Sequence, residues 1–263
     1  MPKIKINDIN MYYEIHGKGE PLVLVSGFSA DHLGWTPVLG ALSQEFQVIL
    51  LNNRGAGQTD VPKGFYSIEQ MAHDIFSLCE ALKIKSAHFI GNSMGGHLVQ
   101  MLAYKYPTLI KKLIISNSAM SIKSVFHIYL NAHLELLKAN APIESLMKAM
   151  CAWGFSAQYL AQPGKLDDLI RLAQQNPYPF TITGYEGQLA AISTFDSSEW
   201  LKEIKAQTLV VTGDQDIILL PELSKKMAAE IPHAQLHCFE NCGHIPHIEY
   251  PQEYVRVIKK FLV

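Results

Sequence analysis

A serine at position 93 stands between two glycines, in the pattern Gly91-x-Ser93-x-Gly95, where a strand is predicted to change into a helix. The apolar run that ends at Ile90 is typical of a buried strand, and apolar residues at helical spacing continue as far as Pro107. A turn this tight strains the serine backbone, and glycines two residues to either side avoid collisions between side chains. The hydroxyl would lie near helix N-terminal amides, which suits a nucleophile beside a site that stabilises negative charge.

Two later turns carry the partners that a nucleophilic serine needs. The predicted strand at 208–212 is followed by Asp214 and Asp216, and the predicted strand at 235–239 is followed by His244. A serine hydroxyl at its free pKa is a poor nucleophile, so it requires an adjacent base that a third group orients. The order serine, carboxylate, histidine therefore predicts nucleophilic catalysis with His244 as the base.

Two backbone N–H groups are predicted to stabilise the oxyanion that such an attack creates. Met94 immediately follows the serine, and Phe28 follows the Ser26-Gly27 turn at the end of another predicted strand. Donors at these positions would point at the oxygen that gains negative charge in acyl transfer.

Alternating strands and helices must position these groups. This alternation predicts an α/β fold, with a mostly parallel central sheet, helices on both faces and ligands at the carboxyl ends of the strands. An N-terminal pair of alternating strands reads as a hairpin. The strands are predicted at 3–6, 9–15, 22–25, 47–51, 87–90, 112–116, 208–212 and 235–239, and the helices at 37–42, 68–82, 96–107, 221–231 and 251–262.

The pattern changes between residues 121 and 200, where no strand pattern is evident. Helical stretches are predicted near 122–139, 143–152 and 165–175. We therefore predict a core made of residues 1–120 and 201–263, with residues 121–200 inserted as a helical cap, or lid.

Composition excludes several classes of function. The chain has 263 residues, 48% of them hydrophobic, and a net charge of -2, which gives no electrostatic footprint for nucleic acid. No apolar run approaches the roughly 20 residues of a membrane span, and the N-terminus lacks the apolar core of a signal peptide. Four scattered cysteines read as reduced thiols. A cytoplasmic protein without membrane or nucleic-acid partners, monomeric or homodimeric, is predicted.

Four motifs spread along the chain resemble those of the α/β-hydrolase superfamily, in the branch of small esterases, lactonases, perhydrolases and carbon–carbon bond hydrolases. The family's D-x-R-G-x-G-x-S loop corresponds to Asn52 to Thr59, and its G-x-S-M-G-G nucleophile elbow to Gly91 to Gly96. Its G-x-x-D acid motif corresponds to Gly213 to Asp216, and its G-H-x-P-x-x-E-x-P segment to Gly243 to Pro251. The resemblance implies the α/β-hydrolase fold and a catalytic triad of Ser93, His244 and Asp216, with neither a cofactor nor a metal.

Two departures from the family pattern bear on the site. The oxyanion segment usually begins His-Gly, whereas this chain has Ser26-Gly27, a substitution familiar in enol-lactonase-like members. Because the donor is a backbone amide, the function is expected to survive. Asn52 replaces the aspartate of the arginine loop, which should change loop packing more than chemistry. Arg54 in that loop is expected to brace it by hydrogen bonds, in preference to binding an anionic substrate.

The family spacing favours Asp216 over Asp214 as the acid. Asn117, which lies where some relatives carry an alternative acid, is not a carboxylate and so supports this choice. Histidines and cysteines near the catalytic histidine raise the alternative of a zinc site, but two of them are consecutive strand residues that face opposite ways, so no metal is predicted. They are His237, Cys238, Cys242, His244 and His247.

The predicted lid should supply most of the substrate pocket. Trp153, Phe155 and Phe126 within it, and Ile245 beside the catalytic histidine, are the candidate lining residues for an apolar acyl or alcohol group. A serine hydrolase that cleaves a small to medium carboxylic ester through an acyl-enzyme is the favoured function, with that small-molecule ester as its partner.

Four alternatives remain open. Enol-lactone hydrolysis is favoured by the Ser26-Gly27 variant, and carbon–carbon hydrolysis of vinylogous diketones by the elbow, although those enzymes usually have Trp where Ile245 stands. Esters on an acidic acyl carrier protein would need a basic docking face, yet residues 121–200 hold five Lys or Arg against seven Asp or Glu. A small-molecule receptor that retains the triad is the fourth.

Overall fold

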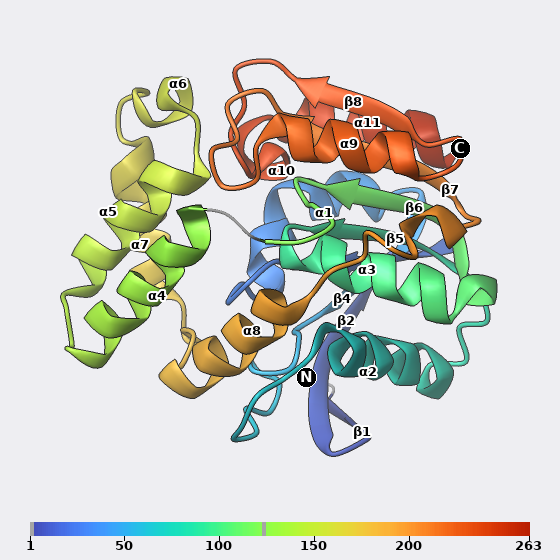
Figure 1. Cartoon of the computed structure of the whole chain (residues 1–263), viewed down its shortest axis with the longest axis horizontal. Coiled ribbons are helices and arrows are strands. Elements are labelled where there is room, and N and C mark those ends of the chain that lie inside the picture. The colour runs from blue at the N-terminus through green and yellow to red at the C-terminus, as the bar shows by residue number, and fades with distance from the viewer. Residues whose placement is uncertain (1–2, 123–124) are drawn as a thin grey trace.

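The computed structural model describes residues 3–122 and 125–263, and eight strands within these residues form one sheet in the order β1-β2-β4-β3-β5-β6-β7-β8 (Figure 1). β2 pairs antiparallel with β1 and β4, and the neighbours from β4 to β8 pair in parallel. The strands are β1 Lys3–Ile6, β2 Ile9–His16, β3 Glu20–Val25, β4 Phe46–Leu51, β5 Ala87–Asn92, β6 Ile110–Ser116, β7 Gln207–Gly213 and β8 Gln235–Phe239. The predicted α/β class and mostly parallel sheet are confirmed.

Helices cover both faces of this sheet, which explains the continuous apolar runs of its central strands. In β3, Leu22 and Leu24 pack toward α1 and α11, whereas Val23 and Val25 pack toward α2, α3 and α9. Strands that are buried on both faces have no polar side to alternate with. These helices are α1 Thr36–Leu42, α2 Ile68–Ala81, α3 Met94–Lys105, α9 Pro221–Glu230, α10 Pro246–Glu249 and α11 Pro251–Leu262, with short 3-10 turns η1 His32–Trp35, η2 Pro107–Leu109 and η3 Leu201–Glu203.

The parallel register brings the carboxyl ends of the central strands together at one edge. Val25 of β3 lies opposite Gly91 of β5, and Asn92 lies opposite Ser116 of β6. The loops that leave these strands therefore meet, although they come from distant parts of the sequence.

A helical segment, residues 125–194, follows β6 and lies beside this edge of the sheet (Figure 1). It contains α4 Val125–Lys138, α5 Ile143–Gly154, α6 Ala157–Leu160, α7 Lys165–Gln175 and α8 Ile182–Thr194. Three of these helices were predicted within a few residues, although residues 123–124 of the stretch predicted at 122–139 lie outside the described chain. No helix in the described residues is both long and apolar enough to cross a membrane.

Helix α8 was not predicted, because its sequence has two glycines and several β-branched residues and so little intrinsic helix propensity. Its start is fixed by Thr181, whose hydroxyl accepts a hydrogen bond from Gly184 N at 3.0 Å. A Cβ at Gly184 would lie 2.0 Å from the carbonyl oxygen of Gly55. The glycine therefore allows α8 to pack directly on the loop after β4, and tertiary contact outweighs its low propensity.

Arg54 in the loop after β4 braces that loop, as predicted. Its guanidinium, 1% exposed, donates to the buried carboxylate of Asp74 at 2.7 and 3.0 Å and to Asp8 at 2.9 Å. The guanidinium holds the pKa of Asp8 at about 2. The loop is thus tied to α2 and to the β1–β2 turn.

Replacing Arg54 by glutamine should destabilise the fold by about 3–5 kcal/mol, because Asp74 would remain buried without its cation. Denaturant unfolding measures the change. Arg256→Gln is the matched control, since Arg256 forms an exposed pair with Glu253, and its effect should stay below about 1 kcal/mol. Equal losses in the two variants would contradict the bracing role.

Candidate active site

Ser93 links β5 to α3 in a backbone conformation that few non-glycine residues adopt. Its φ is 56° and its ψ is -119°. Ser93 N–H donates to Ser116 O at 2.9 Å, and Ser93 O accepts from Gly96 N at 2.8 Å and from Ser118 Oγ at 2.9 Å. These bonds from α3 and the end of β6 hold a strained turn that an isolated peptide would abandon.

The glycines of the turn are required by space. A Cβ at Gly91 would lie 2.2 Å from Gly95 O, and a Cβ at Gly95 would lie 2.1 Å from Val25 O. The turn therefore packs backbone to backbone, both within itself and against β3. The sequence predicted that side chains at these two positions would collide within the turn, and the structure adds a collision with β3.

Asp216, after β7, and His244, after β8, form a buried hydrogen-bonded pair. His244 Nδ1 lies 2.7 Å from Asp216 Oδ2, and these side chains are 6% and 0% exposed. Asp216 Oδ1 accepts from the backbone N–H groups of Ile218 and Leu219, each at 2.9 Å. With Nδ1 donating to the carboxylate, Nε2 is left as the basic nitrogen.

Asn117 and Asp214 have supporting positions around this pair. Asn117 Nδ2 donates to Asp216 Oδ2 at 3.0 Å and to Gly243 O at 3.2 Å, so it joins the acid to the histidine loop. Asp214 is exposed and accepts from Cys242 N at 3.1 Å. Of the two aspartates, Asp216 is the one that is hydrogen-bonded to His244 in the described part of the chain.

The loop that carries His244 is fixed by the helical segment. His244 N donates to Gly154 O at 2.9 Å. The buried carboxylate of Glu249 accepts from Gly243 N at 2.9 Å and from Ser156 N and Oγ at 3.2 and 2.5 Å. Burial raises the pKa of Glu249 above its usual value, against the opposing effect of these hydrogen bonds. Sequence reasoning did not assign Glu249 this role.

The loop after β3 places Gly27, the residue before Phe28, against Ser93. A Cβ added to Gly27 would lie 3.1 Å from Ser93 Cβ. Ser26 Oγ, which stands where relatives have histidine, donates to Asp31 O at 2.9 Å and accepts from Trp35 Nε1 at 3.0 Å. The missing histidine is thus replaced by a hydroxyl that braces the loop from within. Met94 begins α3 and is fully buried beside the serine.

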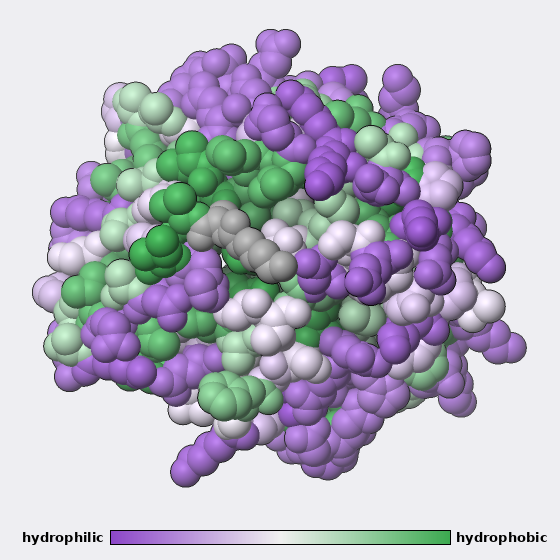
Figure 2. Space-filling model, viewed as in Figure 1, coloured by the Kyte–Doolittle hydropathy of each residue, from purple (hydrophilic) through white to green (hydrophobic). Residues whose placement is uncertain are grey.

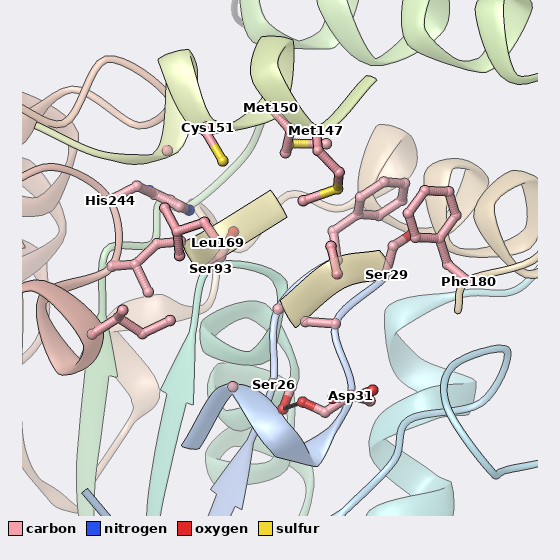
Figure 3. Close-up of a pocket in the computed structure, with 18 of the residues that line it drawn as sticks. Ser26, Ser29, Asp31, Ser93, Met147, Met150, Cys151, Leu169, Phe180 and His244 are labelled. Atoms are coloured by element: carbon pink, nitrogen blue, oxygen red, sulfur yellow. Dashed lines mark hydrogen bonds between the residues drawn. The ribbon is translucent and has the colours of Figure 1, made fainter. Parts of the chain in front are cut away.

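A cavity of about 360 Å³ lies between this edge of the sheet and the helical segment, and both Ser93 and His244 line it. In Figure 3 the ring of His244 extends toward Ser93, with Met150 and Cys151 above them. Figure 2 shows hydrophobic residues gathered on the face where the helical segment meets the sheet. The catalytic candidates therefore face an apolar space.

Three of the four predicted lining residues, Phe126, Phe155 and Ile245, contribute to the cavity wall. Trp153 requires a correction, because it is not among the lining residues. Its ring packs against Phe126 and Tyr129, with ring centroids 5.4 and 5.2 Å apart. The helical position of Trp153 directs the ring toward α4 and away from the cavity.

Several lining residues were not predicted. The face of α5 that meets the cavity carries residues at helical spacing, namely Met147, Met150, Cys151 and Gly154. Leu169 of α7, together with Phe180, Ser29, Asp31 and His133, completes much of the wall. The periodicity of α5 was visible in the sequence, but periodicity alone does not distinguish a cavity-facing stripe from a core-facing one.

Two further histidines surround the pair without joining it. His247 lines the cavity and stacks on Trp35, with ring centroids 4.3 Å apart, whereas His97 packs against Phe195 and does not line it. Burial lowers the pKa of each to about 3, helped by the charge of a protonated His244. Both are therefore neutral at physiological pH. No group of three or more His, Cys, Asp or Glu side chains in the described chain is arranged to hold a metal.

The fold and this arrangement define an α/β hydrolase, and sequence comparison agrees. The chain belongs to the α/β-hydrolase fold family, whose sequence model, described as "alpha/beta hydrolase fold", matches residues 20–251. The family resemblance predicted from the four motifs is thereby confirmed, and hydrolysis is the general activity that the family and its named relatives indicate.

Individual relatives differ in the reaction their names give. The chain is 27% identical to "Putative carbamate hydrolase RutD" of Serratia proteamaculans (strain 568), with 96% of each chain covered. It superposes on an enol-lactonase from Burkholderia xenovorans LB400 with a TM-score of 0.88, 27% identity and 99% of each chain covered. A thermophilic esterase from Thermogutta terrifontis gives a TM-score of 0.85 and 26% identity, with 97% of this chain and 93% of the esterase covered.

Glu249 should make stability depend on pH. Because burial raises its pKa above 4.5, the folded state binds more protons than the unfolded state from about pH 4.5 upward. Its contribution to stability is complete below that pH and is lost as pH rises through the folded pKa. The difference in unfolding free energy between wild type and Glu249→Gln should therefore decline as pH rises above about 4.5 and level off once the pH exceeds the folded pKa.

Denaturant unfolding at a series of pH values measures this difference. Glu240→Gln, which replaces an exposed carboxylate in the same loop, is the matched control and should follow the wild-type profile. A Glu249→Gln profile that also runs parallel to wild type would contradict the assignment.

Proposed function

We propose that this protein is a serine hydrolase that cleaves a small to medium carboxylic ester through an acyl-enzyme. The observation that carries the proposal is the Asp216–His244 hydrogen bond of 2.7 Å beside a strained serine, with serine and histidine lining one apolar cavity. A nucleophile, an oriented base and a water-poor binding space are the parts that acyl transfer requires.

In the proposed mechanism, Ser93 Oγ attacks the ester carbonyl carbon while His244 Nε2 takes the hydroxyl proton. The carbonyl oxygen becomes the oxyanion and accepts hydrogen bonds from the backbone N–H groups of Phe28 and Met94. His244 then gives its proton to the alcohol oxygen as the carbon–oxygen bond breaks. Water, activated by His244, next attacks the acyl-enzyme and releases the acid and free Ser93.

Asp216 stabilises the imidazolium that forms in both steps and keeps the imidazole in its productive tautomer. Its carboxylate accepts hydrogen bonds from Ile218 N, Leu219 N and Asn117 Nδ2, which hold it in position beside His244. In this proposal residues 121–200 act as the cap that excludes water, and residues 1–120 and 201–263 form the catalytic core.

Lactones and carbamates are second candidates, because relatives carry the names enol-lactonase and carbamate hydrolase. The same serine, base and oxyanion donors would open a lactone, in which alcohol and acyl group are one molecule. A carbamate would give a carbamoyl-enzyme, whose nitrogen lone pair slows attack by water. Kinetics with matched esters, lactones and carbamates would rank the three classes.

Ser93→Ala should lower kcat for short p-nitrophenyl esters by about 10⁴-fold or more, because no nucleophile remains. Circular dichroism and thermal unfolding would show that the fold is retained. The matched control, Ser43→Ala, removes a hydroxyl that donates to Gly40 O at the end of α1 and should keep wild-type turnover. Near-wild-type turnover by Ser93→Ala would disprove the proposal.

Asp216→Asn should lower kcat by about 10⁴-fold, because an amide cannot hold the tautomer or stabilise the imidazolium. Asp214→Asn is the matched control, since Asp214 leaves the same strand and bonds Cys242 N instead. It should remain close to wild type in ester turnover. Loss in the Asp214 variant alone would reverse the assignment of the acid.

A further inference from the structure

The charge of the cavity wall restricts what can bind there. Among the described residues, no Lys or Arg lines the cavity, and the one carboxylate, Asp31, accepts hydrogen bonds from Leu33 N at 2.8 Å and Asn176 Nδ2 at 2.7 Å. The nearby loop cation, Arg54, is already paired with two carboxylates and does not line the wall. A substrate carboxylate would therefore lose its hydration and gain no cation.

Three polar atoms of the wall residues lack a hydrogen-bond partner in the described structure, namely Ser29 Oγ, His133 Nδ1 and His247 Nδ1. His247 stacks on Trp35, whereas Ser29 and His133, the latter a residue that is 2% exposed, both lie beside Phe180. Buried polar groups are normally hydrogen-bonded, so such a pair marks a place where a ligand can supply the missing bonds. Burial also lowers the pKa of His133, which keeps its imidazole neutral.

Both groups are held in place by their surroundings. Ser29 has a φ of 55°, and its N–H donates to Gln188 Oε1 of α8 at 2.7 Å. His133 stacks on Tyr185, with ring centroids 5.7 Å apart, and the same tyrosine packs edge-on against Phe28 at 4.6 Å. The two polar groups therefore belong to the same side of the cavity. Figure 3 shows Ser29 beside Phe180 on the side away from His244.

We propose that Ser29 and His133 form a hydrogen-bonding subsite for an uncharged polar group, such as an amide or hydroxyl, on the acyl chain of the substrate. The inference rests on the proposed ester hydrolysis, and it specifies that the acyl chain of the substrate carries no charge. The acyl part is assigned to this wall because it stays bound to Ser93 while the alcohol must depart.

Three p-nitrophenyl esters with acyl groups of equal shape test the subsite. Their chains end in a primary amide, a carboxylate or an isopropyl group, as in the adipamate, adipate and 6-methylheptanoate. For wild type, kcat/KM for the amide should exceed that for the carboxylate by at least ~100-fold, because the site cannot solvate or pair the charge. A carboxylate ester that reacts as fast as the amide would overturn the inference.

Variants of the two polar residues identify the groups responsible. Ser29→Ala and His133→Leu should each lower the ratio of kcat/KM for the amide to that for the isopropyl ester by about 10-fold. Because both esters are measured with the same protein sample, this ratio does not depend on the fraction of the protein that is folded. His133→Asn, whose amide can replace Nδ1 as a hydrogen-bonding group, should retain most of the ratio. Unchanged ratios in both Ser29→Ala and His133→Leu would overturn the subsite.

Binding separates this inference from the proposed function. Titration calorimetry of the three esters with Ser93→Ala protein should rank the amide first and the carboxylate last. Turnover that survives Ser93→Ala would disprove the proposed function, whereas a carboxylate that binds as well as the amide would disprove the subsite alone.

Discussion

The positive φ of Ser93 is the constraint on which the rest of the site depends. A serine in this conformation persists only because glycines remove the colliding side chains and because backbone and hydroxyl groups near the end of β6 hold its amide and carbonyl. The parallel register of β3, β5 and β6 delivers those groups to one point. The packed sheet thus fixes the few backbone atoms around Ser93, and the stability of the core offsets the conformational strain at the serine.

A second set of hydrogen bonds fixes the position of His244. Asp216 receives backbone donors from its own loop, Asn117 joins it to the histidine loop, and Glu249 ties that loop to the helical segment. Each loop is short and internally bonded, and each meets a neighbour through a buried polar contact. A buried polar group that lacks a partner in such a network costs free energy, whereas a network in which every group is paired favours one arrangement of the side chains.

The core was predictable from the sequence because its signals are local. Apolar runs of strand length and a serine between glycines specified the sheet and the turn, and the family spacing singled out Asp216. The limits of the prediction are equally physical. Helix α8 has poor propensity and exists through its packing on the loop after β4, and Trp153 was assigned to the cavity although its helical position directs it toward α4. Ser29 and His133 gave no signal in sequence, because an unpartnered buried atom is visible only in three dimensions.

Gln188 has a consequence for how the cavity can open. Its side chain accepts from Ser29 N at 2.7 Å and donates to Arg54 O at 2.8 Å, so α8 is bonded to the loop that carries Phe28. Moving α8 away from the core would break both bonds and free Ser29 to leave its strained conformation. In the proposed mechanism, displacement of α8 would therefore also release the loop that presents the Phe28 amide, so that access to the cavity and assembly of the oxyanion donors would be coupled.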